Sequence, residues 1–175
     1  RVNFNSTANS PNIWGKTKFW GEINFQVNSD NSIQFWCANS ISGNKYSVIK
    51  SDPSVIKLGE WYDIVVIFDN SKAYIYLNGS LIKTNLFWTA QGGTLLSNSQ
   101  LDNSFNFSQD NNSSNFGYRT YLSDSVGFLD GKIDDIGIWN RALIQSEITA
   151  MYQQIVPNAV TDINGNTYNA LVIGK

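Results

Sequence analysis

The sequence contains no histidine among its 175 residues. Without an imidazole, a Ser-His-Asp relay, a histidine metal site or a histidine general base cannot be assembled. Glycoside hydrolysis instead needs two carboxyl groups that face each other across a cleft. The three glutamates, Glu22, Glu60 and Glu147, are scattered over a strand start, a turn and a helix. Most aspartates fall in turns, where a side-chain hydrogen bond to the backbone explains them. We therefore predict that the protein is not an enzyme.

The single cysteine, Cys37, lies in an apolar run and has no partner for an internal disulfide. A reactive thiol needs a histidine or another cationic neighbour. The sequence therefore indicates a buried structural thiol.

Two adjacent aspartates, Asp134 and Asp135, are the candidate metal ligands. Calcium prefers six to eight hard oxygen ligands, which carboxylates and amides supply. Neighbouring residues of a strand point to opposite faces, so the two side chains cannot both bind one ion. We predict a structural calcium ion at one of them. The alternative is that both cap strand ends without a metal.

Aromatic side chains beside amides and carboxylates are suited to sugars, because pyranose rings have apolar faces and hydroxyl rims. Arg119 adds a cation that suits a carboxylate-bearing sugar, or else a surface ion pair. The candidate binding residues lie near predicted strand ends or loops: Trp14, Trp20, Trp88, Tyr118, Arg119 and Tyr121. Three other tryptophans lie in strong strand patterns and are expected in the core: Trp36, Trp61 and Trp139.

Charge and hydropathy exclude two classes of partner. The net charge is −2 and only 15% of the residues are charged, so nothing attracts the chain to phosphate backbones. We predict no nucleic-acid partner. No apolar stretch has the length of a transmembrane helix, so we predict no membrane insertion.

The elements that would position these residues are short strands. Trp61–Phe68 reads as a buried strand, and Ala73–Leu77 reaches Asn78-Gly79, a strong signal for a two-residue hairpin turn before Ser80–Leu86. Gly21–Val27 and Ser32–Ala38 read as another antiparallel pair. Strands at this spacing predict an all-β antiparallel sandwich, a jelly roll.

Three further segments complete the prediction. The polar stretch 91–114 is expected to be a loop or a binding rim. A short helix is expected over 143–153, with Ile144, Ile148, Met151 and Tyr152 on one apolar face. The tail after Val160 reads as a hairpin with Asn164-Gly165 as its turn.

Two motifs resemble a known family. The run F-L-D-G-K-I-D-D-I-G-I-W-N-R-A-L from Phe128 and the run W-Y-D-I-V-V-I-F-D-N-S-K-A-Y-I-Y-L-N-G from Trp61 are similar to laminin-G-like and pentraxin-like, concanavalin A-type domains of bacterial surface proteins. The resemblance implies a structural calcium ion near the aspartate pair. Such domains begin with further strands before the position of Gly21, so we expect an exposed sheet edge that pairs with residues outside the chain or with a protein partner.

The tail, T-D-I-N-G-N-T-Y-N-A-L-V-I-G from Thr161, is similar to the start of the Fibrobacter major paralogous domain. We accordingly divide the chain into a sandwich over 1–154 and a linker with the opening hairpin of another domain over 155–175.

We predict a carbohydrate-binding or adhesion module of a secreted multidomain protein, extracellular or on the cell surface, with a glycan or cell-surface polysaccharide as partner. The alternatives are a structural spacer in a large exoprotein and an accessory domain of a polysaccharide-degrading enzyme.

Overall fold

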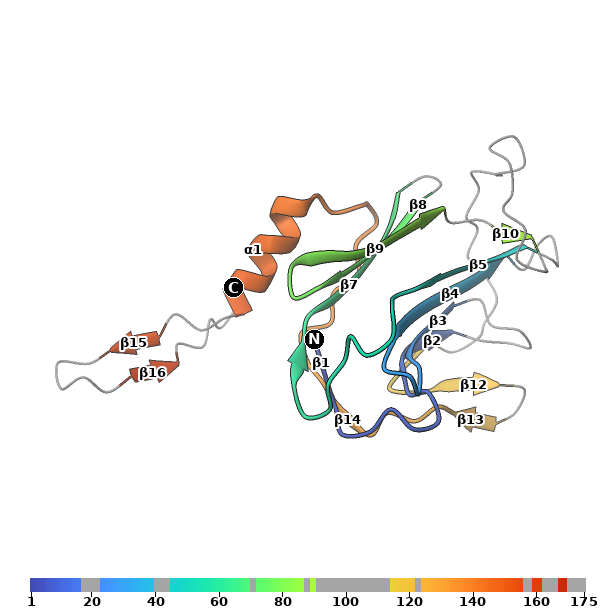
Figure 1. Ribbon diagram of the computed structural model, residues 1–175, viewed down its shortest axis with the longest axis horizontal. Helices are drawn as coiled ribbons and strands as arrows, with labels where there is room; N and C mark the ends of the chain where they lie inside the picture. Colours follow the sequence, from blue (N-terminus) through green and yellow to red (C-terminus); the bar gives the residue numbers. More distant parts are fainter. Residues whose placement is uncertain are drawn as a thin grey trace.

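The computed structural model describes residues 1–16, 23–39, 45–69, 72–86, 89–90, 114–121, 124–155, 159–161 and 167–169. Two layers of antiparallel strands face each other (Figure 1). One layer is a six-stranded sheet in the order β10-β5-β4-β3-β2-β11. Its strands are β2 (Asn12–Lys16), β3 (Ile23–Val27), β4 (Ile33–Asn39), β5 (Lys45–Lys50), β10 (Thr89–Ala90) and β11 (Ser114–Phe116).

Two three-stranded sheets form the second layer. One has the order β7-β8-β9, with β7 (Ile64–Asp69), β8 (Lys72–Leu77) and β9 (Ser80–Leu86). The other has the order β14-β1-β6, with β1 (Val2–Phe4), β6 (Trp61–Tyr62) and β14 (Gly131–Ile133). The two sheets are linked through the chain, because only Asp63 separates β6 from β7.

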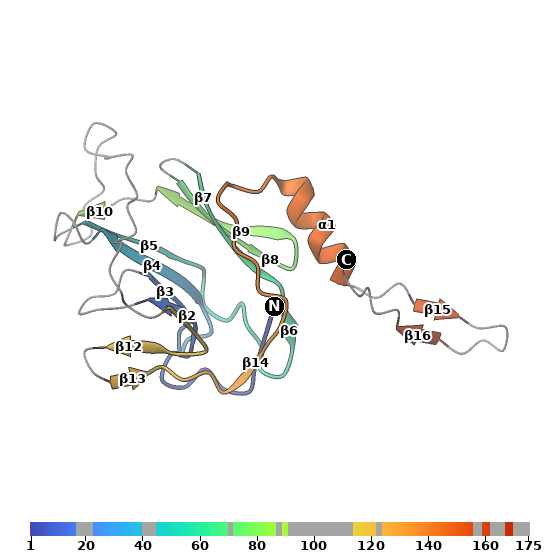
Figure 2. The same ribbon diagram turned by 180° about the vertical axis from the view of Figure 1, so that it is seen from behind.

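Smaller elements flank the two layers. Helix α1 (Gln145–Ile155) lies on the β7-β8-β9 sheet, on the side away from the six-stranded sheet (Figure 2). The hairpin of β12 (Arg119–Tyr121) and β13 (Asp124–Val126) lies beside β2 (Figure 1). A second hairpin pairs β15 (Ala159–Thr161) with β16 (Thr167–Asn169). The prediction of an antiparallel β-sandwich with one short helix is confirmed.

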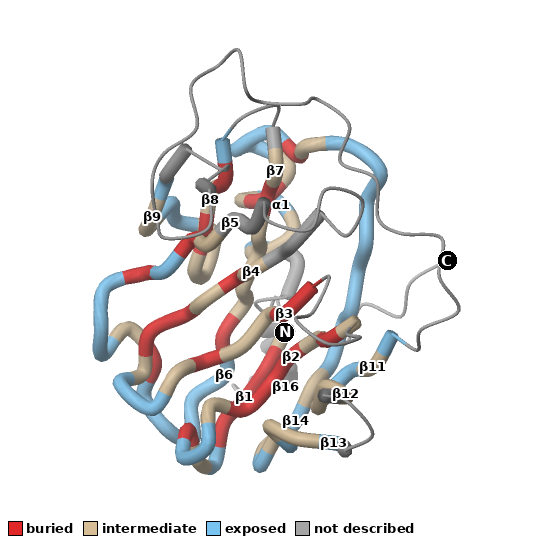
Figure 3. Tube along the Cα trace, turned by 90° about the vertical axis from the view of Figure 1, so that its right-hand side faces the viewer, coloured by how far each residue is buried: buried red, intermediate tan, exposed pale blue. Residues whose placement is uncertain are grey.

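The core fills the space between the layers. Phe35 on β4 contacts Phe25 of its own sheet, with ring centroids 5.8 Å apart, and Phe68 of the facing layer at 4.8 Å. Val2 and Phe4 are buried in the same cluster, so the amino-terminal strand belongs to the core (Figure 3). A smaller cluster joins the outer side of β7 and β8 to the helix through Ile67, Leu143 and Ile148.

Four local predictions were wrong. The segment 61–68 is not one strand, since it breaks at Asp63 and serves two sheets. Trp61 is 40% exposed rather than buried, and the guanidinium group of Arg1 lies over its ring, 5.4 Å from the ring centroid. Trp139 is 46% exposed, because β14 ends at Ile133 and the chain from 134 to 144 leaves the sheet. The helix begins two residues later than expected, so Ile144 precedes it and is exposed.

The turn at Asn78-Gly79 has the predicted form and also fixes the break at Asp63. Asn78 and Gly79 have φ values of 49° and 77°, as a type I′ turn requires. The side chain of Asn78 accepts a hydrogen bond from the Asp63 N–H at 2.9 Å, and the Asn78 N–H donates to the Asp63 carbonyl at 2.8 Å. This turn therefore positions the junction between the two sheets of the second layer.

A substitution at Gly79 tests this role. Gly79 has a positive φ of 77°, and a Cβ atom added there would lie 3.2 Å from the Tyr152 ring. Gly59 also has a positive φ, 81°, but a Cβ atom added there would have no neighbour within 4 Å. We expect Gly79→Ala to lower the free energy of unfolding by more than the ~1–2 kcal/mol that a left-handed backbone costs, and Gly59→Ala by no more than that amount. Urea unfolding of both variants measures the difference. Equal losses would show that the contact with Tyr152 carries no energy.

The helix start depends on Glu147. Its carboxylate accepts hydrogen bonds from Arg141 Nη1 at 2.7 Å and Nη2 at 2.6 Å, and from the Ile144 N–H at 3.0 Å. The ion pair with Arg141, followed by the Ile144 N–H, lowers the pKa of Glu147 to about 2.

This lowered pKa predicts an acid-dependent loss of stability. The carboxylate stabilises the fold above its ordinary pKa of 4.5, and the stabilisation disappears as the pH falls from there toward 2. We expect Glu147→Gln to be less stable than the parent at pH 7 and to approach it at pH 2.5. Thermal unfolding midpoints across this range measure the convergence, and a difference that stays constant with pH would contradict the assignment.

Candidate functional site

The outer face of the six-stranded sheet carries polar side chains where its inner face carries apolar ones. On β3, Ile23, Phe25 and Val27 point into the core, so Asn24 and Gln26 point outward. The register pairs Asn24 with Trp36 and Gln26 with Gln34 on β4. Directly paired residues of antiparallel strands share a face, so these four side chains lie together. We call them the amide face.

A chain of hydrogen bonds orders the amide face. Asn24 Nδ2 donates to Gln26 Oε1 at 2.8 Å, and Gln26 Nε2 donates to Asn28 Oδ1 at 2.7 Å. Asn28 Nδ2 then donates to Ser32 Oγ at 2.9 Å and to Gln34 Oε1 at 3.1 Å. The network uses the amides as donors in sequence, which holds their side chains in fixed orientations.

One acceptor at the end of this network has no hydrogen-bond partner among the described residues. Asn24 is 2% exposed, and its Oδ1 atom is buried without a hydrogen bond in the described part of the chain. Asn12 on β2 pairs with Gln26, lies on the same face and is 1% exposed. Its Oδ1 atom is also buried without a hydrogen bond among the described residues. A buried acceptor without a donor is costly, so a donor such as a water or a ligand hydroxyl is expected at each.

Arg119 reaches this face through a close backbone approach. Gly15 pairs with Asn24 in the register and therefore shares its face. A Cβ atom added at Gly15 would lie 2.5 Å from the Cβ atom of Arg119, so only glycine lets β12 pack over β2. On the strand beyond Gly15, Asn115 donates from Nδ2 to Thr120 Oγ1 at 3.4 Å. The Cβ atom of Arg119 thus lies against Gly15, the cross-strand neighbour of Asn24 at one end of the amide face. Lys50, paired with Gln34 in the register, lies at the other end.

The predicted aromatic residues are not brought together. Trp14 lies on the inner side of β2, where it stacks on Phe116 with centroids 6.1 Å apart and donates from Nε1 to Ser114 Oγ. Tyr118 stacks on Phe128, with centroids 5.6 Å apart, outside the amide face. Trp20 and Trp88, and the side chain of Tyr121, lie outside the described residues.

The sequence did not lead us to the four residues that lie together on the amide face, Asn24, Gln26, Gln34 and Trp36. Trp36 was expected in the core, but its register with Asn24 places it, half-buried, on the outer face. The available signal was the alternation in I-N-F-Q-V over 23–27, in which amides occupy every outward position.

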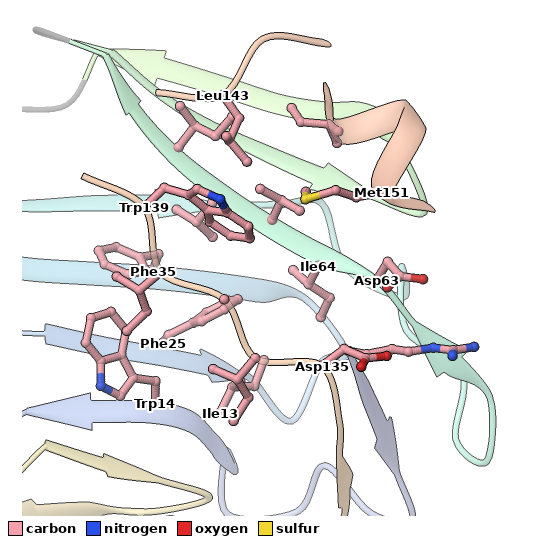
Figure 4. A pocket seen from close by; sticks show the side chains of 18 of the residues that line it. Ile13, Trp14, Phe25, Phe35, Asp63, Ile64, Asp135, Trp139, Leu143 and Met151 are labelled. Atoms are coloured by element: carbon pink, nitrogen blue, oxygen red, sulfur yellow. The ribbon is translucent and has the colours of Figure 1, made fainter. Parts of the chain in front are cut away.

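A hollow of about 740 Å³ lies between the layers and along β7, the terminal strand in the order β7-β8-β9 (Figure 4). Its walls include Phe25 and Phe35 of the six-stranded sheet and Ile64 of β7. The segment 135–142 lies across it from β7. The lining is mainly aliphatic and aromatic, so this space suits an apolar occupant rather than a sugar.

Charges gather at one end of this hollow. Burial raises the pKa of Asp63, while the positive charges of Arg1 oppose that shift. Asp135, whose φ is 49°, contributes a second carboxylate close to Asp63 (Figure 4). Asp134 accepts a hydrogen bond at Oδ1 from the neighbouring Asp135 N–H at 2.9 Å.

These aspartates do not form a complete calcium site among the described residues. Calcium needs six or more oxygens, and no group of three or more acidic, cysteine or histidine side chains able to hold a metal occurs in the described part of the chain. Asp134 instead caps a backbone amide, which is the alternative that the sequence left open. Calcium at Asp134 or Asp135 stays a prediction.

A family model described as the concanavalin A-like lectin/glucanases superfamily matches residues 2–149. The chain belongs to this superfamily. The matched region contains both layers and the start of the helix. It ends before the tail, so the resemblance of the tail to the Fibrobacter domain stays a prediction. No curated protein sequence matches the chain.

Solved structures share the fold at low sequence identity. The CBM40 of the Ruminococcus gnavus IT-sialidase has a TM-score of 0.61 and 12% identity, covering 86% of this chain and 78% of that one. The heptameric SAP-like pentraxin of Limulus polyphemus has a TM-score of 0.53 and 15% identity, covering 97% and 77%. The receptor-binding domain of botulinum neurotoxin type G has a TM-score of 0.52 and 16% identity, covering 95% and 38%.

Within the described residues, no helix is long and apolar enough to cross a membrane.

Thermal unfolding tests the calcium prediction. A metal that binds only the folded chain raises the midpoint, by RT ln(1 + [Ca²⁺]/Kd) in free energy. If calcium binds at the aspartate pair, the unfolding midpoint is higher in calcium than in EDTA, and Asp134→Asn or Asp135→Asn removes the difference. The control Asp52→Asn keeps the difference, because the Asp52 carboxylate pairs with Lys83 elsewhere. Identical midpoints in calcium and EDTA would leave Asp134 as a backbone cap alone.

Proposed function

We propose that the chain is a non-catalytic carbohydrate-binding module that holds a glycan on the amide face. The observation that carries the proposal is the half-buried Trp36 side chain, whose cross-strand neighbour Asn24 has an Oδ1 atom without a hydrogen bond in the described part of the chain. The apolar face of a pyranose packs on an indole, and its hydroxyls bond the amides beside Trp36 directly or, at the buried Asn24 oxygen, through a water.

The rest of the face has the chemistry of a sugar site. Gln26 and Gln34 are half-buried amides that both donate and accept hydrogen bonds, as vicinal hydroxyls require. Their orientations are already fixed by hydrogen bonds, so little side-chain entropy is lost on binding. Amide-rich sites of this kind bind through many moderate hydrogen bonds and do not need a catalytic carboxylate.

The charge on the face favours an acidic sugar. Arg119 lies at one end, and Lys50 at the other is held by Asp30 at 2.8 Å. The Ruminococcus gnavus CBM40 was solved with α2,3- and α2,6-sialyllactose bound. We extend this to the present chain as a proposal, in which the Arg119 guanidinium pairs with a sugar carboxylate.

The wider role follows from this binding. A module of this type serves adhesion or the retention of polysaccharide outside the cell, and we propose an extracellular or cell-surface location. The role of a spacer makes no use of the Trp36 ring on the outer face, so it ranks second.

Binding to a glycan panel tests the proposal. We expect the chain to bind sialylated oligosaccharides more tightly than their neutral counterparts. Trp36→Ala is expected to weaken all binding at least tenfold, because the stacking surface is lost. Arg119→Gln is expected to remove the preference for the acidic sugar, by about ten- to a hundredfold, while neutral binding stays.

The control is Leu81→Ala. Leu81 is 47% exposed on β9, in the other layer, and its truncation is expected to leave both affinities unchanged. Circular dichroism and unfolding midpoints establish that each variant is folded. The proposal fails if no glycan of the panel binds, or if folded Trp36→Ala binds as the parent does. In that case the spacer is the better account.

A further inference from the structure

The hydrogen bonds of the amide face continue past its edge and end at a carboxylate. Asn28 Nδ2 donates to the Ser32 hydroxyl at 2.9 Å, and this hydroxyl donates in turn to Oδ1 of Asp30. The same Asp30 oxygen accepts the Ser32 N–H at 3.0 Å, while Oδ2 accepts from Lys50 Nζ at 2.8 Å. The series of hydrogen bonds that begins at Asn24 thus ends on a charged group in the turn before β4.

A carboxylate at the end of the series allows only one direction of donation. An ionised carboxylate accepts hydrogen bonds and donates none, whereas a hydroxyl or an amide can present either a donor or an acceptor after it turns. The hydrogen bonds from Lys50 and Ser32 lower the pKa of Asp30 to about 2, so the group is ionised at neutral pH. Ser32 is fully buried and must find its partners within the protein. Its hydroxyl therefore donates to Asp30 and accepts from Asn28.

The direction then passes from one amide to the next, along Asn24, Gln26 and Asn28, which we call the amide row. Since Asn28 donates to Ser32, its oxygen faces Gln26 and accepts from Nε2 at 2.7 Å. The oxygen of Gln26 then faces Asn24 and accepts from Nδ2 at 2.8 Å. Hydrogen bonds in such a series polarise one another, and a bond to an ionised acceptor is stronger than one between neutral groups. The atom left over at the far end is Asn24 Oδ1, in the pair with Trp36.

Gln34 does not set this direction, although it also contacts the row. Its Oε1 atom accepts from Asn28 Nδ2 at 3.1 Å. A half-turn of the Gln34 amide would present its NH2 group to Asn28 instead, so this contact is compatible with either direction. Asp30 is the one acceptor-only side chain in the series of hydrogen bonds that the described residues form.

We propose that Asp30 is a positioning residue of the glycan site, which fixes the direction of the amide row through Ser32. The inference rests on the proposed function for its ligand. With this direction Asn24 offers an oxygen, so the site selects sugars that place a hydroxyl donor near it, directly or through a water. In the opposite direction Asn24 would offer its NH2 group and select an acceptor.

Two substitutions of Asp30 separate its charge from its role as an acceptor. Asp30→Asn and Asp30→Ala both remove the ion pair with Lys50. Asparagine keeps an oxygen toward Ser32, because the Ser32 N–H still requires an acceptor there, whereas alanine supplies none. We expect NMR contacts between the Asn24 NH2 protons and the Gln26 side chain in the parent and in Asp30→Asn. In Asp30→Ala we expect these contacts to weaken about twofold or more, because both directions of the row become populated.

Glycan affinity supplies the second readout, with α2,3-sialyllactose as the probe. We expect Asp30→Asn to bind it no more weakly than the parent, and Asp30→Ala to bind it about tenfold more weakly, the worth of one hydrogen bond. Ser32→Ala keeps the carboxylate but removes the hydroxyl that links it to Asn28, so we expect the same loss. The double variant is expected to lose no more than either single one, because both substitutions interrupt the same path.

Three results decide the question once unfolding midpoints have established that the variants are folded. Unchanged contacts between Asn24 and Gln26 in Asp30→Ala and Ser32→Ala would overturn the proposal. Equal losses in Asp30→Asn and Asp30→Ala would also overturn it, since the charge alone would then be responsible. A role confined to the turn would disturb Asn28 and leave Asn24 as it is. Failure of the parent to bind sialyllactose counts against the proposed function alone, because the NMR contacts are measured without a ligand.

Discussion

The contact between Phe35 and Phe68 across the two layers is the interaction on which the rest of the structure depends. It fixes which face of each sheet is inward, because the side chains of a strand alternate between its two sides. Once Phe35 points inward, its neighbours Gln34 and Trp36 must point outward. Pairing with β3 then sets Asn24 and Gln26 beside them. The amide face is therefore the other side of the core, and a shift of one residue in register would exchange the two.

A separate contact accounts for the interruption of the second layer. β6 and β7 follow each other along the chain, but at Asp63, between them, the backbone N–H donates a hydrogen bond to the Asn78 side chain. Before that point β1 is the neighbour, and after it β7 pairs with β8 in the described part of the chain. The junction between the two sheets is thus set by a turn in the middle of the chain, far in sequence from β1.

The sequence predicted those parts of the fold that short-range rules determine. The Asn78-Gly79 turn was found because its backbone needs two positive φ values, and β3 and β4 because they flank the polar turn at 29–31. Trp61 and Trp139 were misplaced because an aromatic residue beside β-branched neighbours looks the same whether its strand continues or ends. Strand ends are decided by partners. The amides of the candidate site were overlooked for a related reason, since the outward register of Asn24 beside Trp36 exists only after β3 and β4 have paired.

The amide face and the hollow lie on opposite sides of the six-stranded sheet. The amide face carries side-chain amides whose orientations are fixed by one another, so its geometry depends on a rigid sheet. Phe25 and Phe35, which line the hollow, alternate with Asn24, Gln26, Gln34 and Trp36 on the same two strands. The aromatic side chains between the layers therefore pack against the backs of the strands that carry the amide face. The core side of the sheet thus supplies the support that holds the binding side in shape.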